Sequence, residues 1–187
     1  MTEILKLAAF SDGETGGNPA GVWIGDALPD ESHMQAIAAE VGFSETAFAA
    51  PLDGGRWRVR YFSPLAEVPF CGHATIALGA ALAAQHGDGV FDLQLNQASI
   101  TVEGHAQGTL VSAALQSPPT HSKPISEALL NEALTLFGYA RDQLDPRIPP
   151  AAINGGAGHL VLALNSREAL GAMRYDQAAG RELMVRE

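Results

Sequence analysis

The sequence contains a single cysteine, Cys71, and few aromatic residues, which make up 6% of its 187 positions. One thiol cannot form a disulfide within the chain, and it cannot supply the several thiolates of a structural zinc site. Basic residues are also scarce: 11 Lys and Arg stand against 21 Asp and Glu, and the formal net charge is −10. Because binding to a phosphate backbone needs clustered positive charge, no nucleic-acid partner is expected.

Long hydrophobic runs are missing as well. The first residues hold no basic segment followed by a long apolar core, so no signal peptide is expected. The longest apolar stretch is too short and too rich in alanine to span a bilayer, so no membrane partner is expected either. Hydrophobic residues nevertheless make up 47% of the chain against 17% charged residues, which is enough for a folded core. A cytoplasmic protein is the default expectation.

That apolar stretch, residues 72–86 (GHATIALGAALAAQH), predicts a helix enclosed by other structure. Alanine and leucine favour helix, apolar residues on every face indicate burial all round, and Gly87 provides an end. The start of such a helix offers unpaired N–H groups and partial positive charge, which suit a bound carboxylate or oxyanion. Gly72 would let a ligand approach the backbone closely. The structural alternative is that Gly72 only permits a tight turn and that His73 only caps its neighbours.

Patterns on either side of this helix predict an α+β fold. Strands are expected at residues 3–10, 20–24, 43–50, 57–62, 90–95, 99–102, 108–115, 149–153 and 159–164. Further helices are expected at residues 30–41, 126–138, 166–173 and 175–185. Turns are expected at residues 96–97 and 103–105, and residues 117–124 predict a linker at a domain boundary. Residues 1–116 should therefore form one compact unit, followed by a linker and a second, partial unit over residues 117–187.

One carboxylate stands inside a short apolar strand. Glu45 lies between Phe43 and Phe48, where a glutamate either faces solvent at the end of the strand or has a chemical role. Glu67, in the turn before the helix, is the second carboxylate to consider, and its position favours a structural hydrogen bond. The histidines lack the spacing of a zinc or iron site, and no glycine motif has a nucleotide-binding context. No metal and no cofactor is therefore expected.

Four short segments occur in a distinctive order and spacing. They are residues 18–22 (NPAGV), 44–48 (SETAF), 61–64 (YFSP) and 67–75 (EVPFCGHAT). Together they resemble the phenazine-biosynthesis (PhzF-like) isomerase family. The resemblance implies the diaminopimelate-epimerase-like fold, in which each of two similar halves wraps a mixed, largely antiparallel sheet around a central buried helix. Residues 72–86 would be the central helix of the first half, and the second repeat would be incomplete.

By the same resemblance, Glu45 corresponds to the family's general acid/base, and Gly72 and His73 correspond to residues that bind and orient the substrate. The implied function is a cofactor-independent isomerase that shifts a proton on a small carboxylate-bearing substrate, for which one carboxylate suffices. A racemase with two facing cysteines is excluded, because Cys71 is the only thiol. Cys71 is then expected to be a small packed residue rather than a nucleophile.

The far end of the chain departs from the family pattern. Residues 154–187 contain nothing like the aspartate-bearing glycine loop that leads into the second central helix of family members. The alternative function is therefore a truncated, catalytically impaired relative that binds a small molecule or a partner. Apolar residues at this end would then be exposed and would favour self-association, for example as a homodimer. These residues are Leu160, Leu162 and 183–185.

Overall fold

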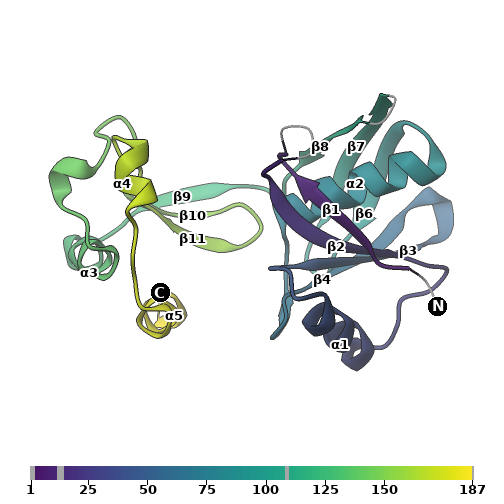
Figure 1. Cartoon of the computed structure of the whole chain (residues 1–187), viewed down its shortest axis with the longest axis horizontal. Coiled ribbons are helices and arrows are strands. Elements are labelled where there is room, and N and C mark those ends of the chain that lie inside the picture. Colours follow the sequence, from purple (N-terminus) through teal and green to yellow (C-terminus); the bar gives the residue numbers. More distant parts are fainter. Residues whose placement is uncertain (1–2, 12–14, 108–109, 187) are drawn as a thin grey trace. The chain divides into compact units, whose positions relative to one another are not determined.

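The computed structural model describes residues 3–11, 15–107 and 110–186. The chain divides into two units, Met1–Pro119 (unit 1) and Thr120–Glu187 (unit 2), which Figure 1 colours from purple to teal and from green to yellow. This division falls within the segment that the sequence predicts as a linker. In the described part of the chain, no helix has the length and apolar content needed to cross a bilayer.

Unit 1 is built on an eight-stranded mixed sheet. Its elements are β1 (Leu5–Ala9), β2 (Asn18–Ile24), α1 (Glu31–Val41), β3 (Thr46–Pro51), η1 (Asp53–Gly55), β4 (Trp57–Phe62), β5 (Glu67–Val68), α2 (Gly72–His86), β6 (Gly89–Gln94), β7 (Ser99–Gln107) and β8 (Leu110–Gln116). The strand order is β1-β2-β3-β4-β6-β7-β8, with the short β5 paired to β4. The pairs β2–β3 and β4–β6 are parallel. Each of these pairs is joined through a helix, α1 or α2, because parallel neighbours need a crossover connection.

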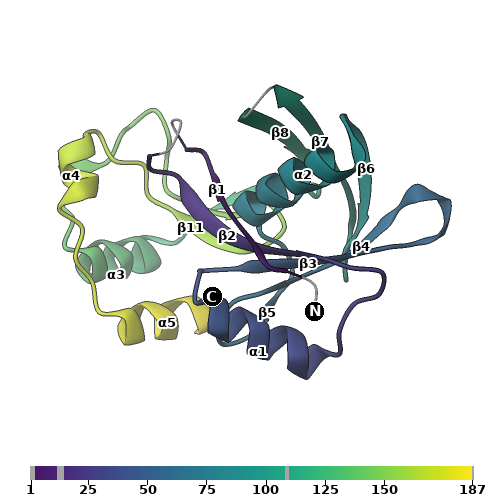
Figure 2. The same cartoon turned by 45° about the vertical axis from the view of Figure 1, so that its right-hand side comes forward.

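Helix α2 is the core of unit 1, and the sheet curves around it (Figures 1 and 2). It packs against β1, β2, β3, β6, β7 and β8, and Ala74, Leu78 and Leu82 are fully buried. A helix enclosed on several sides has little surface left for water, which explains why it contains no Asp, Glu, Lys or Arg. The predicted enclosed helix over residues 72–86 is confirmed, and with it the α+β fold.

Helix α1 covers the opposite face of β2, β3 and β4. Alternate residues of these strands belong to the core around α2 and to a second apolar cluster under α1, as the two-residue period of a strand requires. The α1 cluster is formed by Trp23, Met34, Ala38, Phe48 and Phe62. Strand β3 is buried on both faces, which explains why residues 46–50 form a continuous uncharged run instead of an alternating one.

Two glycines allow the backbones of α2 and β7 to come into direct contact. A Cβ atom on Gly104 would lie 2.5 Å from the carbonyl oxygen of Gly79 and 2.7 Å from Cβ of Ala83. A Cβ atom on Gly79 would lie 2.3 Å from Cγ2 of Val102. Neither glycine has a positive φ, so the close approach itself requires them.

Unit 2 contains a three-stranded antiparallel sheet in the order β11-β10-β9. Its elements are β9 (His121–Pro124), α3 (Glu127–Phe137), η2 (Arg141–Gln143), β10 (Ala151–Asn154), β11 (Gly158–Val161), α4 (Arg167–Gly171) and α5 (Gln177–Arg186). Helix α3 begins after Ser126, whose hydroxyl accepts a hydrogen bond from the N–H of Leu129, and it ends at Gly138 in the left-handed region. The predicted helix over residues 126–138 is therefore confirmed.

Three sequence predictions are wrong. Residues 121–124 are not linker but the edge strand β9, which ends at Pro124; an edge strand is where a sheet can accommodate a proline. Residues 103–105 are not a turn but lie within β7, which pairs with both β6 and β8. Leu183, predicted to be exposed, is only 4% exposed, because α5 packs against α3. Leu160 and Leu162 are half-buried. Val185 is exposed, as predicted. Residues 108 and 109 of the predicted strand 108–115 lie outside the described residues.

Candidate active site at the start of helix α2

Helix α2 begins without a side-chain cap. Cys71 occupies the capping position in an extended conformation, and its side chain makes no capping hydrogen bond. Its carbonyl oxygen accepts bonds from the N–H and the hydroxyl of Thr75, at 3.0 and 2.7 Å. The N–H groups of Gly72 and His73 lie in the first turn of this helix, at its positively polarised terminus, and the N–H of His73 also interacts with the Cys71 sulfur.

A buried hydroxyl pair holds this helix start against the sheet. The Tyr61 hydroxyl lies 2.7 Å from the Thr75 hydroxyl, and both side chains are almost fully buried. Burial raises the pKa of Tyr61 well above its usual range, so the phenol stays neutral. Tyr61 and Thr75 are positioning residues that the sequence analysis did not single out, although both lie within the segments that carry the family resemblance.

Glu45 lies beside this helix start. It immediately precedes β3, and its carbonyl oxygen accepts a hydrogen bond from the N–H of Gly21 at 3.1 Å, which ties it to β2. Its carboxylate oxygen Oε2 is 3.6 Å from Nε2 of His73, and the two side chains are 21% and 11% exposed. The Ser44 hydroxyl lies 3.4 Å from the same nitrogen. The structure thus brings Glu45, Gly72 and His73 to one partly buried place.

Cys71 is the third reactive side chain at this place. Its Sγ lies 3.2 Å from Nδ1 of His73, and donor atoms of Glu45, Cys71 and His73 all lie within 4.8 Å of one another. Burial raises the pKa of the Cys71 thiol to about 12, and the nearby Glu45 carboxylate acts in the same direction. Since the thiolate is the nucleophilic form, Cys71 is a poor nucleophile here.

Glu67 is held in a structural ion pair. Its carboxylate accepts two hydrogen bonds from Arg60, at 2.7 and 2.5 Å, and a third from the Asn96 amide at 2.7 Å. The Arg60 guanidinium lowers the pKa of Glu67 below its usual range. A carboxylate whose lone pairs are already engaged is poorly placed to take a proton from a substrate, so Glu45 is the better candidate base.

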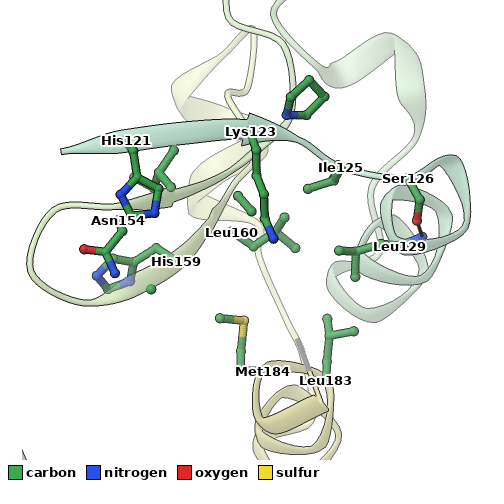
Figure 3. A pocket seen from close by; sticks show the side chains of 14 residues that line it. His121, Lys123, Ile125, Ser126, Leu129, Asn154, His159, Leu160, Leu183 and Met184 are labelled. Carbon is green, nitrogen blue, oxygen red and sulfur yellow. Dashed lines mark hydrogen bonds between the residues drawn. The ribbon is translucent and has the colours of Figure 1, made fainter.

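A separate groove of about 430 Å³ lies within unit 2 (Figure 3). Figure 3 shows His121, Asn154 and His159 grouped at one end and Leu129 and Leu183 at the other. The sequence analysis predicted none of these as site residues, because they come from separate strands and helices that only tertiary pairing brings together. No carboxylate occurs among its described lining residues. This groove can bind an amphipathic molecule, but it lacks the carboxylate acid/base expected here.

Comparison with known proteins shows a family likeness along almost the entire chain. The profile of the family described as "Phenazine biosynthesis-like protein" (PhzC-PhzF) matches residues 7–186. An uncharacterized isomerase of Pseudomonas aeruginosa is 33% identical over 179 residues, which cover 95% of this chain and 62% of that protein. The trans-2,3-dihydro-3-hydroxyanthranilate isomerase of Pseudomonas fluorescens is 31% identical over 183 residues, covering 96% and 63%. The chain thus spans less than two thirds of the length of these curated relatives.

Solved structures show the same fold. A predicted epimerase from Pseudomonas aeruginosa superposes with a TM-score of 0.85 at 24% identity, covering 98% of this chain and 67% of that one. The diaminopimelate-epimerase-like fold that the sequence predicts is therefore confirmed over the 98% of this chain that superposes.

Proposed function

We propose that this chain, which belongs to the phenazine biosynthesis-like (PhzC-PhzF) family, is a cofactor-independent isomerase that moves a proton on a small carboxylate-bearing substrate. The observation that supports this function most directly is the Glu45 carboxylate, 3.6 Å from His73 at the uncapped start of α2. A proton-shifting enzyme needs a base beside donors that stabilise the negative charge left on the substrate. This place combines the two.

Each residue has a distinct role in the proposal. Glu45 removes a proton from carbon, exchanges it with solvent while it is a carboxylic acid, and then protonates a second position on the same face, so that a single carboxylate serves as base and then as acid. The N–H groups at Gly72 and His73 bind the substrate carboxylate or the charge that develops during proton removal. The His73 ring donates a further hydrogen bond and fixes the orientation of the substrate.

Gly72 carries a specific prediction, because neither packing nor backbone conformation requires a glycine there. Its φ is not positive, and an added Cβ would meet only Cδ2 of Leu115 at 3.9 Å, an ordinary contact. Gly72→Ala should therefore keep or slightly raise stability, while the new methyl group keeps a ligand away from the helix N–H groups. We expect ligand affinity to fall at least about tenfold, or about 1.4 kcal/mol. Calorimetric titration and thermal unfolding of the same samples test this; a lower Tm with unchanged affinity would contradict it.

The named activity of the Pseudomonas fluorescens relative supplies a first probe substrate, trans-2,3-dihydro-3-hydroxyanthranilate. The experiment incubates the 187-residue chain with this compound in D₂O and follows binding, isomer formation and deuterium incorporation by NMR. The proposal predicts an isomer that carries solvent deuterium. If neither this compound nor a panel of cyclic and amino-acid carboxylates exchanged a proton, the isomerase function would be rejected for this chain.

The groove in unit 2 favours a second candidate, a module that binds a small molecule without turnover. Exposed His121, Lys123 and His159 line this space of about 430 Å³, in a chain of net charge −10. Binding of a carboxylate probe that depends on Lys123 and not on Gly72, without proton exchange, would support this second function over the first.

A further inference from the structure

Glu45, Cys71 and His73 place three different metal-binding atoms in one small volume. A carboxylate oxygen, a thiol sulfur and an imidazole nitrogen all lie within 4.8 Å of one another. We propose that these residues bind a thiophilic divalent cation of the zinc class, and that the bound ion inhibits proton transfer at this site. The binding site goes beyond the isomerase function, whereas the inhibitory effect rests on it.

The three side chains lie near enough for one tetrahedral ion to bind them once they rotate. With zinc–ligand bonds of about 2.0 to 2.3 Å, neighbouring ligand atoms lie about 3.3 to 3.8 Å apart. Sγ of Cys71 is 3.2 Å from Nδ1 of His73, and Oε2 of Glu45 is 3.6 Å from Nε2. These two distances run to different nitrogens of the His73 ring, so one ion can bind all three residues only after the ring or the carboxylate turns. One ligand atom of each residue already lies within 4.8 Å of the other two, which is close enough for such a rotation to bring them together. Three protein ligands leave a fourth position for water, as in zinc sites that are not closed.

The ligand types select the class of ion. Sulfur and imidazole nitrogen favour zinc and its neighbours, whereas magnesium and calcium prefer oxygen ligands throughout. Cys71 and His73 are held at the rigid start of α2, where Thr75 bonds to the Cys71 carbonyl. Because Ser44 Oγ is 3.4 Å from Nε2, its hydroxyl can hold the ring in the tautomer that leaves Nδ1 free to ligate. The thiol proton passes to solvent when the metal–sulfur bond forms.

The ion would act as an inhibitor and not as a cofactor. Coordination uses the lone pair with which Glu45 would accept a proton from carbon. The ion would also stand in front of the N–H groups of Gly72 and His73, where the substrate carboxylate is proposed to bind. Removing the metal should therefore restore proton transfer, with no change in the fold of unit 1.

Cobalt(II) titration of the 187-residue chain tests the site directly. Because Cys71 is the only cysteine, a near-ultraviolet thiolate-to-cobalt charge-transfer band can arise from this residue alone. We expect one equivalent of Co²⁺ to produce the band and Zn²⁺ to displace it. Cys71→Ser should abolish the band, and Glu45→Gln should weaken Co²⁺ binding about 10- to 100-fold. Glu103→Gln is the control, since Glu103 lies beside His105 and Asp88 in an exposed cluster without a thiol, and it should change nothing.

The outcomes separate this inference from the proposed function, because the titration needs no substrate. Absence of the band at millimolar Co²⁺, or a band whose affinity is unaffected by Glu45→Gln, would overturn the three-ligand site. Metal binding by a chain without isomerase activity would retain the site and reject the proposed function. In an active preparation, Zn²⁺ should suppress deuterium exchange and EDTA should restore it. Exchange that continues with zinc bound would overturn the inhibitory effect.

Discussion

Replacement of Glu45 by glutamine is expected to lower the rate of substrate proton exchange about 10²- to 10⁴-fold, the range that a general base contributes. The amide keeps the shape of the side chain next to His73, but it cannot accept a proton from carbon. Substrate affinity should change by no more than a few-fold, since the N–H donors at Gly72 and His73 remain. Exchange rates by NMR, affinity by calorimetry and the Tm of the variant separate these effects.

Glu67→Gln is the matched control for that variant. It makes the same chemical change in the other carboxylate that the sequence analysis considered. That carboxylate is engaged by Arg60 and Asn96 and has no proposed contact with the substrate. It should leave the exchange rate within a few-fold of wild type while reducing stability. If Glu67→Gln lost proton exchange while Glu45→Gln retained it, Glu67 and not Glu45 would be the general base.

Gly104→Ala is expected to destabilise unit 1 by about 3 kcal/mol, because its new methyl group would enter the backbone of α2. The carbonyl oxygen of Gly79, at 2.5 Å, cannot move aside as a flexible side chain could, and α2 is enclosed by strands on several sides. Either α2 shifts away from β7 or β7 bends, and both changes loosen the packing of Leu78 and Leu82. Urea unfolding should show a lower midpoint for this variant.

Gly89→Ala provides the comparison for Gly104→Ala. Gly89 on β6 is the register partner of Gly104 on β7, and a Cβ atom there would meet nothing within 4 Å. The same substitution on the neighbouring strand should change the free energy of unfolding by no more than about 0.5 kcal/mol. Equal losses in the two variants would show that the close approach of α2 and β7 is not the cause.

Local sequence patterns could predict the elements whose own residues show, by their composition and spacing, how deeply they are buried. The charge-free residues 72–86 predicted a helix enclosed on several sides, and the apolar run around Phe48 predicted a short strand, which the structure shows to be buried on both faces. The α1 and α3 helices could be placed from their capping residues and terminal glycines. The grouping of Glu45 with the start of α2 followed from the family resemblance, because residues 45 and 72 are too far apart for periodicity to relate them.

Features that depend on pairing between distant segments could not be predicted. Strand β9 forms from residues rich in serine and proline because β10 offers it a partner, a reason that is absent from its own sequence. Leu183 is buried by α3, about 50 residues earlier in the chain. The contact of Cys71 with His73 could have been noticed from their two-residue spacing, but only the structure shows that ligand atoms of Glu45, Cys71 and His73 lie within 4.8 Å of one another.

The measurement that tests the central claim most directly is deuterium incorporation from D₂O into trans-2,3-dihydro-3-hydroxyanthranilate, compared between wild type, Glu45→Gln and Glu67→Gln. Mass spectrometry of the substrate and product pools gives the result without assumptions about the product's structure. The account predicts incorporation by wild type and by Glu67→Gln, and a loss of about 10²-fold or more in Glu45→Gln. Equal incorporation by wild type and Glu45→Gln would contradict the assignment of Glu45 as the group that carries the proton.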